Sequence, residues 1–291
     1  MKKTTLKSYR ARLIRVIDYM YQHIEDNLDV NTLADVALMS PYHFHRIYRE
    51  LARENINSTV RRLRLQHAAS ALIRSDVSLP SIAKQVAYGS AEAFSRAFSK
   101  EFGESPSEYR LSRQGAENRQ PFVATLPNAK QEYSPMYEVK ITDFSGVDLI
   151  ALEHRGDYMN ISQVFEKLAI LAGNKGLFGT ESRWFGIYYH DPKTVEEKTL
   201  RAHACLSLHS DTPLETDLPI ERIKIQGGKC ATLLFKGAYA ELEKPYDWFF
   251  GQWLPRSGYE AADFPCFEEY LNDAKTTPPS DLLTNIHCLL K

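Results

Sequence analysis

The chain has 291 residues, enough for about two domains of ordinary size. It is 43% hydrophobic and 25% charged, as soluble globular proteins are, and it has no apolar run of the roughly 18 residues that span a bilayer. The opening MKKTTLKSYR lacks an apolar segment behind its lysines, so we expect no secretory signal and a cytoplasmic protein. The four cysteines form no Cys-x-x-Cys pair and are expected to be buried thiols rather than a zinc site: Cys205, Cys230, Cys266 and Cys288.

The net charge of −1 conceals two halves of opposite sign. Residues 1–115 carry 18 Lys+Arg against 12 Asp+Glu, a net +6, whereas residues 136–291 carry 16 against 23, a net −7. The first half is therefore suited to a polyanion, and the second to a neutral or cationic partner.

The first predicted elements are helices. Apolar residues at helical spacing predict a helix over 11–27, and Asn31 is expected to cap a short helix after it. After a turn near 39–40, Pro41 suits the first turn of a second helix. That helix should bury Phe44, Ile47, Tyr48 and Leu51 and leave its other face outside: Tyr42, His43, His45, Arg46 and Arg49.

The same pattern returns about fifty residues later. FHRIYREL (44–51) and FSRAFSKEF (94–102) share the frame Phe-x-Arg-x-aromatic, and a helix over 59–74 lies between the two units. Ser78 should cap the short helix of the second unit, and the turn falls at 87–90. The following helix should bury Phe94, Ala97, Phe98 and Phe102 and expose Glu92, Ser95, Arg96, Ser99 and Lys100.

Two short-helix, turn, basic-helix units suggest a protein that reads DNA. A major groove admits one helix, and an arginine there can pair bidentately with guanine. Two such helices in one chain could read two groove segments about one helical turn apart. The alternative is a helical bundle whose repeat serves packing alone.

The residues also carry a resemblance. AFSRAFSKEFGESPSEYR (93–110) and LADVALMSPYHFHRIYRE (33–50) resemble the AraC/XylS-type DNA-binding domain. The resemblance implies base contacts from residues of two helices: Tyr42, His45, Arg46, Ala91, Glu92, Ser95 and Arg96. Arg49 and Lys100 are further candidates for DNA contact because of their charge. Two departures concern local geometry, because the family usually has Gly where this chain has Ala87 and near residues 52–54.

A polar, proline-containing stretch over 113–135 reads as a linker. Beyond it, LIALEHRGDY (149–158) matches CATLLFKGAY (230–239), and WFGIYYHD (184–191) matches CFEEYLND (266–273). Each half reads as strand, helix, strand, with further strands expected over 137–143, 202–209, 221–226 and 283–290. The pattern predicts two β-α-β-β units with a cleft between them.

Strand alternation selects a candidate site in this second half. One face carries Phe185, Ile187, Tyr189, Phe267, Glu269 and Leu271, and we expect this more apolar set to pack on the helices. The other face brings Glu268 together with Trp184, Tyr188 and Tyr270, an arrangement suited to a cationic or amphipathic ligand. The alternative is that the aromatic residues are core and that Glu268 is solvated.

HRGDY (154–158), WLPRSGYE (253–260) and FEEYLND (267–273) resemble the GyrI-like small-molecule-binding domain. The resemblance implies a ligand-contacting acid at Glu268 and a set of pocket aromatics: Tyr158, Trp184, Tyr188, Trp253 and Tyr270. Gly186 stands at the position that the repeat relates to Glu268, so one central carboxylate is expected.

The sequence thus predicts an all-α double helix-turn-helix domain (1–112), a linker (113–135) and an α+β domain (136–291). We expect a transcriptional regulator whose partners are double-stranded DNA and a small effector, with RNA polymerase a further candidate. No membrane contact, cofactor, metal or catalytic residue is expected. The alternatives are a small-molecule hydrolase, for which His154 and His203 are the candidate bases, and a protein-binding module.

Overall fold

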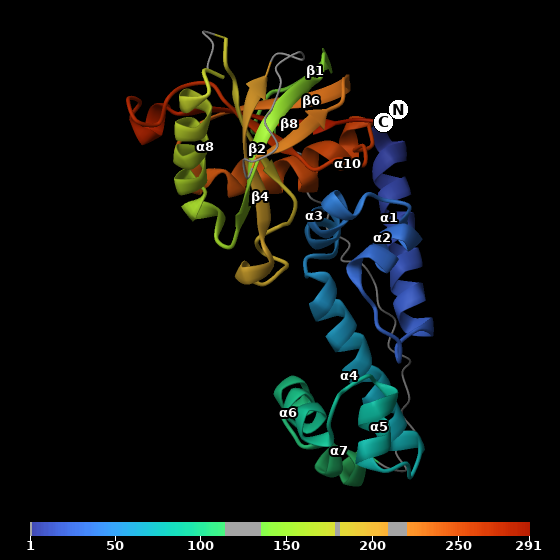
Figure 1. Ribbon diagram of the computed structural model, residues 1–291. Coiled ribbons are helices and arrows are strands. Elements are labelled where there is room, and N and C mark those ends of the chain that lie inside the picture. Colours follow the sequence, from blue (N-terminus) through green and yellow to red (C-terminus); the bar gives the residue numbers. More distant parts are fainter. Residues whose placement is uncertain (1, 114–134, 178–180, 209–219) are drawn as a thin grey trace. The chain divides into compact units, whose positions relative to one another are not determined.

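The computed structural model describes residues 2–113, 135–177, 181–208 and 220–291 (Figure 1). The expected linker, 113–135, therefore lies almost wholly outside the described residues. The chain divides into two compact units, and the segment Ser40–Ile47 groups with the C-terminal residues while most of the helical region forms the other unit.

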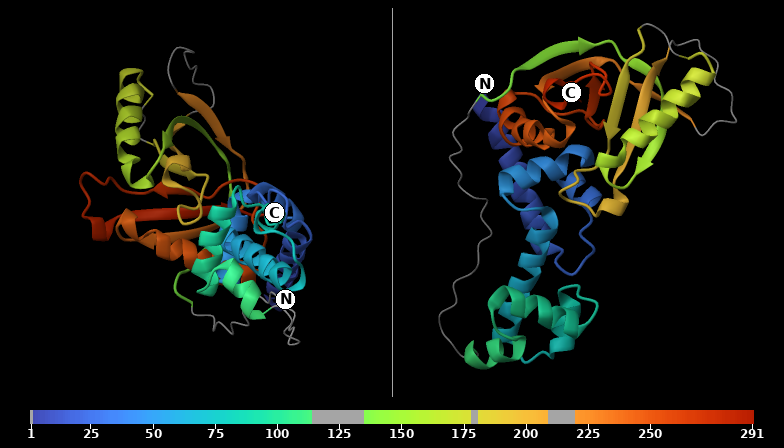
Figure 2. Two further views of the ribbon diagram at one scale, coloured as in Figure 1. Left: turned by 90° about the horizontal axis from the view of Figure 1, so that it is seen from below. Right: turned by 90° about the vertical axis from the view of Figure 1, so that its left-hand side faces the viewer.

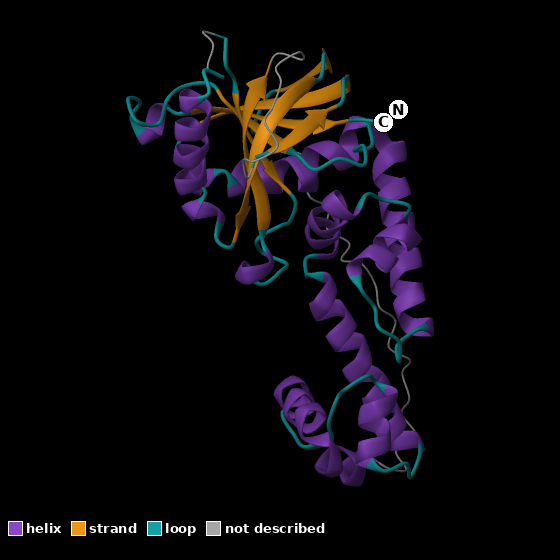
Figure 3. Cartoon of the chain, in the orientation of Figure 1, coloured by secondary structure: helices purple, strands orange, loops and turns teal. Residues whose placement is uncertain are grey.

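The N-terminal part is helical, as expected (Figure 3). Its helices are α1 (Lys2–Gln22), α2 (Val30–Ala37), α3 (Pro41–Ala52), α4 (Ile56–Arg74), α5 (Leu79–Gln85), α6 (Ala91–Phe102) and α7 (Pro106–Arg113).

Side-chain caps begin several of these helices. Ser78 caps α5 as predicted, and Ser90 caps α6 by accepting from the backbone N–H of Ala93 at 3.1 Å. The predicted cap at Asn31 is wrong: Asp29 caps α2, because its Oδ1 accepts from the N–H groups of Asn31 (2.9 Å) and Thr32 (3.1 Å).

The second helix-turn-helix unit has its own apolar core. Phe94 and Phe98 of α6 are buried, whereas Ala97 and Phe102, also expected inside, are partly buried. The Arg110 side chain fastens α7 to this core by donating to the backbone carbonyls of Leu72 and Val77. The core therefore fixes which face of α6 points outward.

The turns contain left-handed backbone at residues other than glycine. Leu38 (φ 55°), Arg53 (φ 62°) and Ala87 (φ 56°) all have positive φ. Arg53 and Ala87 stand at the two places where the sequence departs from the family's glycine. For a residue with a Cβ, this conformation costs roughly 1–2 kcal/mol.

We therefore expect Ala87→Gly to stabilise the helical unit by about 0.5–1 kcal/mol, because relief of strain exceeds the entropic cost of glycine. Urea unfolding followed by far-ultraviolet circular dichroism measures this. Ala97→Gly, within α6, is the matched control and should destabilise by a similar amount. If Ala87→Gly also destabilises, strain at that turn is negligible.

The C-terminal part is an α+β domain built on one antiparallel sheet of eight strands, in the order β1-β6-β8-β7-β3-β4-β2-β5. The strands are β1 (Val139–Phe144), β2 (Val147–Arg155), β3 (Trp184–Tyr188), β4 (Arg201–Leu208), β5 (Glu221–Ile225), β6 (Gly228–Lys236), β7 (Phe267–Tyr270) and β8 (Leu283–Leu289).

The expected duplication is present. β2, helix α8 (Ser162–Asn174), β3 and β4 form one unit, and β6, a broken helix, β7 and β8 form the other. The broken helix consists of α9 (Glu243–Trp248), the π-helical turn η4 (Phe249–Trp253) and α10 (Leu254–Ser257). α8 lies across one face of the sheet (Figure 2).

The sheet curls so that one of its faces is turned inward. Phe185, Ile187 and Phe267 pack there against residues from six other strands, including edge-strand residues Phe144 and Ile225. The helices cover the opposite face, where Trp184 and Tyr188 pack with residues of α8. The expectation that the more apolar face meets the helices is therefore wrong: a curled sheet buries that face against itself.

Candidate DNA-contacting helices and effector site

α6 presents a polar and basic outer face. Glu92, Arg96 and Lys100 are exposed, and Ala91 and Ser95 are half-buried beside them. Successive residues three or four apart lie on one side of a helix, so these side chains share a surface. This placement is compatible with the predicted contacts to DNA, which remain a prediction.

α3 carries the second predicted set. Tyr42, His45, Arg46 and Arg49 are half-buried, but His43, expected on the outer face, is buried with 2% exposure. His43 is buried because its ring stacks on Phe250 of η4, with ring centroids 5.4 Å apart.

Arg46 packs on aromatic rings of the broken helix in the C-terminal domain. Its guanidinium carbon lies 4.4 Å from the ring centroid of Tyr246 and 5.6 Å from that of Phe250. This is cation–π geometry, and it places a positive charge beside the candidate effector site.

Glu268 of β7 is the centre of that site. The residue is 4% exposed, so the expected alternative of a solvated carboxylate is wrong. Its Oε1 accepts a hydrogen bond from the Tyr246 hydroxyl (3.1 Å), and its Oε2 accepts one from the Tyr270 hydroxyl (2.9 Å). A third hydroxyl, that of Tyr188, lies 2.7 Å from the Tyr270 hydroxyl.

Gly186 makes room for this chain of hydroxyls. It lies directly opposite Glu268 in the β3–β7 pairing. A Cβ at this position would come within 2.6 Å of the Tyr270 hydroxyl and 2.8 Å of the Tyr188 ring. The missing side chain is thus the condition for the two tyrosines to meet.

The other predicted aromatics differ in position. Tyr158 packs edge-on against Tyr188, with ring centroids 4.9 Å apart. Trp184 reaches the group through Phe165, whose ring contacts both Trp184 (6.0 Å) and Tyr270 (5.4 Å). Trp253 instead stacks on Phe249 within η4.

Sequence reasoning missed Tyr246, Phe165, Tyr239 and the approach of Arg46. The duplication contains a signal for three of them. Tyr239 aligns with Tyr158 and contacts Tyr270 at 5.3 Å, as Tyr158 contacts Tyr188. Continued at the same offset, the alignment places Tyr246 opposite Phe165. Arg46 comes from a distant segment and has no such signal.

Burial decides the electrostatics of the site. It raises the pKa of Glu268 to about 7, although hydrogen bonds from Tyr270 and Tyr246 and the charge of Arg46 act in the opposite direction. Burial and the nearby Glu268 likewise raise the pKa of Tyr246, so its hydroxyl remains a donor. An additional cation would stabilise the ionised carboxylate.

The neighbouring Glu269 has a structural environment on the inward face of the sheet. Its Oε1 accepts from Arg183 Nε at 2.6 Å, and its Oε2 lies 3.2 Å from His287 Nε2. Burial acts to raise the pKa of Glu269, but the hydrogen bonds from His287 and Arg183 outweigh it and lower the value to about 2.

A carboxyl group whose pKa is lower in the folded state than in the unfolded state stabilises the fold at pH values above its unfolded pKa. This stabilisation is lost as the pH falls towards the folded pKa. We therefore expect the C-terminal domain to lose stability as the pH falls from 4.5 towards 2, and Arg183→Gln to lessen this loss because it raises the folded pKa of Glu269. Glu269 contributes at most about 3 kcal/mol to the free energy of unfolding of the domain. Solvent screening of the partly exposed Arg183 side chain makes this contribution smaller.

Urea unfolding followed by tryptophan fluorescence checks this, since the three tryptophans (Trp184, Trp248 and Trp253) all lie in the C-terminal domain. Lys198→Gln, which removes an exposed ion pair with Glu196, is the matched control and should leave the pH profile unchanged. Identical profiles for Arg183→Gln and the unaltered chain would contradict the assignment.

The profile of the GyrI-like small molecule binding domain matches residues 137–290, more than half of the chain. The chain belongs to the GyrI-like family. A second profile, for a helix-turn-helix domain of the AraC type, matches residues 33–112. The GyrI-like domain thus follows an AraC-type domain, as the sequence predicts.

Relatives resemble one part or the other. A DNA gyrase inhibitor of Edwardsiella piscicida is 31% identical over 144 residues, which are 48% of this chain and 90% of that protein. The regulatory protein SoxS of Salmonella typhimurium is 28% identical over 103 residues, 35% of this chain and 96% of that protein.

Among solved structures, the EcmrR C-terminal domain is similar to the GyrI-like domain, with 19% identity, a TM-score of 0.46, and coverage of 54% of this chain and 98% of that one. The match to EcmrR in a DNA complex covers 90% of this chain and 98% of the EcmrR chain, with 14% identity and a TM-score of 0.48. In the described ranges, no helix has the length and apolar character to cross a membrane.

Proposed function

We propose that this AraC-type regulator binds DNA sequence-specifically through α3 and α6 and binds a small cationic or amphipathic effector at Glu268 of its GyrI-like domain. The observation that supports the effector most is a buried carboxylate with hydroxyl donors and aromatic rings around it. Such a site gains most from a ligand that brings a positive charge and apolar surface together.

Arg46 indicates which chemistry the aromatic wall accepts. Its guanidinium already lies over Tyr246, the tyrosine that donates to Glu268. An effector cation that takes this place competes with Arg46. Because Arg46 belongs to α3, the first candidate recognition helix, effector binding changes the availability of that helix for DNA. RNA polymerase is the partner that a regulator of this kind would recruit or exclude.

The two alternatives have different support. The gyrase-inhibitor relatives favour a protein-binding module as a second candidate. The hydrolase gains no support from its candidate bases. His203 faces the inside of the curl with Cys205, on the opposite face from Glu268, and His154 Nε2 is hydrogen-bonded to the carbonyl of Asp157 at 2.8 Å.

Calorimetric titration of the full chain with tetraphenylphosphonium and with neutral triphenylphosphine oxide tests the effector site. We expect saturable binding of the cation, and binding at least about tenfold weaker for the neutral probe, which lacks the charge that pairs with Glu268. Equal affinities would contradict a charge-selective pocket.

Fluorescence anisotropy tests the coupling to DNA, on a duplex selected in vitro with the full chain. The cation should change the dissociation constant for that duplex, and the neutral probe should not. If the chain binds neither probe yet inhibits gyrase supercoiling, the protein-binding alternative replaces the effector proposal.

A further inference from the structure

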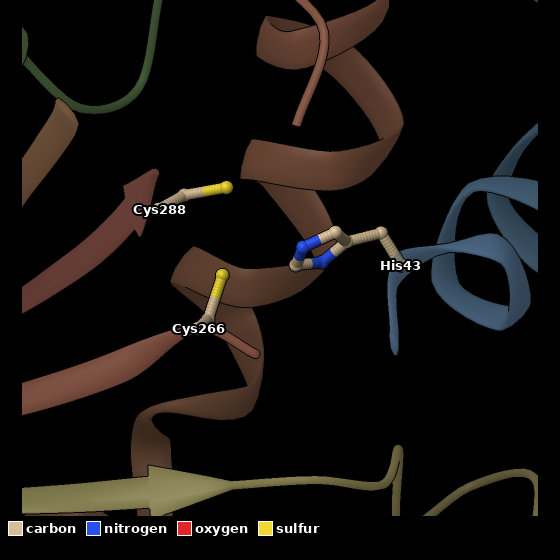
Figure 4. A group of neighbouring side chains, drawn as sticks. All are labelled: His43, Cys266 and Cys288. Carbon is tan, nitrogen blue, oxygen red and sulfur yellow. The ribbon is translucent and has the colours of Figure 1, made fainter. Parts of the chain in front are cut away.

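Three soft donor groups converge in the unit that contains the C-terminal domain. His43 comes from α3, Cys266 precedes β7 and Cys288 lies in β8 (Figure 4). One ligand atom from each lies within 4.8 Å of the others, and the exposures of the three residues are 2%, 5% and 1%.

The two thiols are brought together by the sheet. β7 and β8 are antiparallel and pair Phe267 with His287, so Cys266 and Cys288 are the next opposed residues. Directly opposed residues in adjacent strands point to the same face. This is the face of Glu268, which the broken helix and the start of α3 cover.

One nitrogen of the His43 imidazole is already hydrogen-bonded within the protein. His43 Nε2 lies 2.9 Å from the carbonyl oxygen of Phe264, which can only accept a hydrogen bond. In the neutral ring the proton is therefore on Nε2, so that Nδ1 is the nitrogen that can bind a metal ion. Ligating histidines commonly donate their second nitrogen to a carbonyl in this way. Stacking on Phe250 and the Ser40–Asp263 hydrogen bond (2.8 Å) further fix the start of α3.

We propose that His43, Cys266 and Cys288 form a three-coordinate site for a thiophilic d¹⁰ metal ion, with Cu(I) preferred over Zn(II). Thiolate and imidazole donors suit both ions, but Zn(II) generally takes four ligands and the described residues bring three donors to this point. Cu(I) bound by two thiolates carries a single net negative charge, which the positive charge of the nearby Arg46 offsets.

Binding releases whatever protons the two cysteines still carry as their sulfur–metal bonds form, with no change of oxidation state. The ion would tie α3 to β7 and β8. The spacing of the cysteines alone does not predict this site, because the third donor precedes Cys266 by more than 200 residues. The proposal rests on different observations from the effector site, although the two sites share Arg46 and helix α3.

Reconstitution of the full, reduced chain tests the site. Unfolded apo-protein is refolded anaerobically with Cu(I) held by bathocuproine disulfonate, and in a second arm with Zn(II) and a chromogenic chelator. We expect one Cu(I) per chain that resists the chelator, weaker Zn(II) binding, and sulfur and nitrogen neighbours of the copper in X-ray absorption.

Single variants identify the ligands. Cys266→Ser and Cys288→Ser should each lose chelator-resistant copper, and His43→Phe should weaken retention at least about tenfold. Cys205→Ser is the matched control, because it removes an equally buried thiol outside the cluster and should retain the ion. Circular dichroism checks that each variant refolds.

Several results would overturn the proposal. The proposal fails if the chain holds neither ion, or if Cys205→Ser loses the ion as the cluster variants do. It also fails if His43→Phe retains copper as well as the unaltered chain, because the site would then consist of two thiols without the imidazole. Zn(II) held more tightly than Cu(I) would overturn the preference, and a serine variant that does not refold is replaced by the alanine variant.

Discussion

Glu268→Gln should weaken the binding of a lipophilic cation to the full chain by at least about 2 kcal/mol, roughly thirtyfold, while the affinity for a neutral analogue stays the same. The substitution keeps the size of the side chain and an acceptor for the Tyr246 or Tyr270 hydroxyl, but removes the charge. Titration calorimetry with tetraphenylphosphonium and triphenylphosphine oxide measures both affinities.

Glu269→Gln is the matched control for this experiment. It removes a carboxylate from the next residue, which lies on the inward face and is held by Arg183 and His287. We expect little effect on cation binding and a lower stability of the domain. If Glu269→Gln is the variant that loses the cation, the ligand lies inside the curl; if neither does, recognition depends on shape and apolar contact.

Arg96→Ala should relax the sequence preference of DNA binding at one half-site, at a cost of about 1–3 kcal/mol if the guanidinium pairs with a guanine. Arg96 is exposed on α6, and the second-unit core fixes that helix face outward. Footprinting and competition with single-base operator variants, on a duplex selected in vitro, measure the preference base by base.

Lys100→Ala, one turn further along α6, separates base reading from phosphate contact. A lysine that touches phosphate weakens all sequences alike, and its loss lowers the salt dependence by about one ion. If Arg96→Ala and Lys100→Ala weaken every sequence equally, α6 contacts the backbone alone and the assignment of Arg96 to a base is wrong.

Much of the fold could be predicted because its determinants are local or repeated. Ser78, Pro80 and the apolar spacing of Phe94 and Phe98 identify the second helix-turn-helix unit within a short window. The two β-α-β-β units could be recognised because each half repeats the other. The cap of α2 was misplaced by two residues, since Asp29 and Asn31 are both good cap residues and only backbone geometry decides between them.

The face covered by the helices could not be predicted in the same way. Alternation shows that Phe267 and Glu268 point to opposite faces, but not which face meets a helix. That depends on the curl of the whole sheet, a property of all eight strands together. Apolar character alone predicts that the face with Phe185 and Phe267 meets the helices, whereas the curl buries it against other strands.

The candidate site was predictable in its strand residues and not in the residues that reach it from other elements. Glu268, Tyr270 and Tyr188 follow from alternation and the repeat. The burial of His43 does not, because local amphipathicity treats histidine as polar and its hydrogen-bond partner Phe264 is 221 residues away. Local amphipathicity likewise predicts Arg46 on the outer face, because it treats arginine as polar.

The pairing of Gly186 with Glu268 has a consequence for the valence of the ligand. A symmetric duplication with a glutamate in both halves would set two carboxylates on directly opposed positions of neighbouring strands. Two such carboxylates repel each other, so either one of them would stay protonated or the pair would require a ligand with two positive charges. With glycine in one half, the site carries at most a single negative charge, which is present when Glu268 is ionised. We therefore expect it to favour monocations over dications of the same size, since a second positive charge would be desolvated without a counterion.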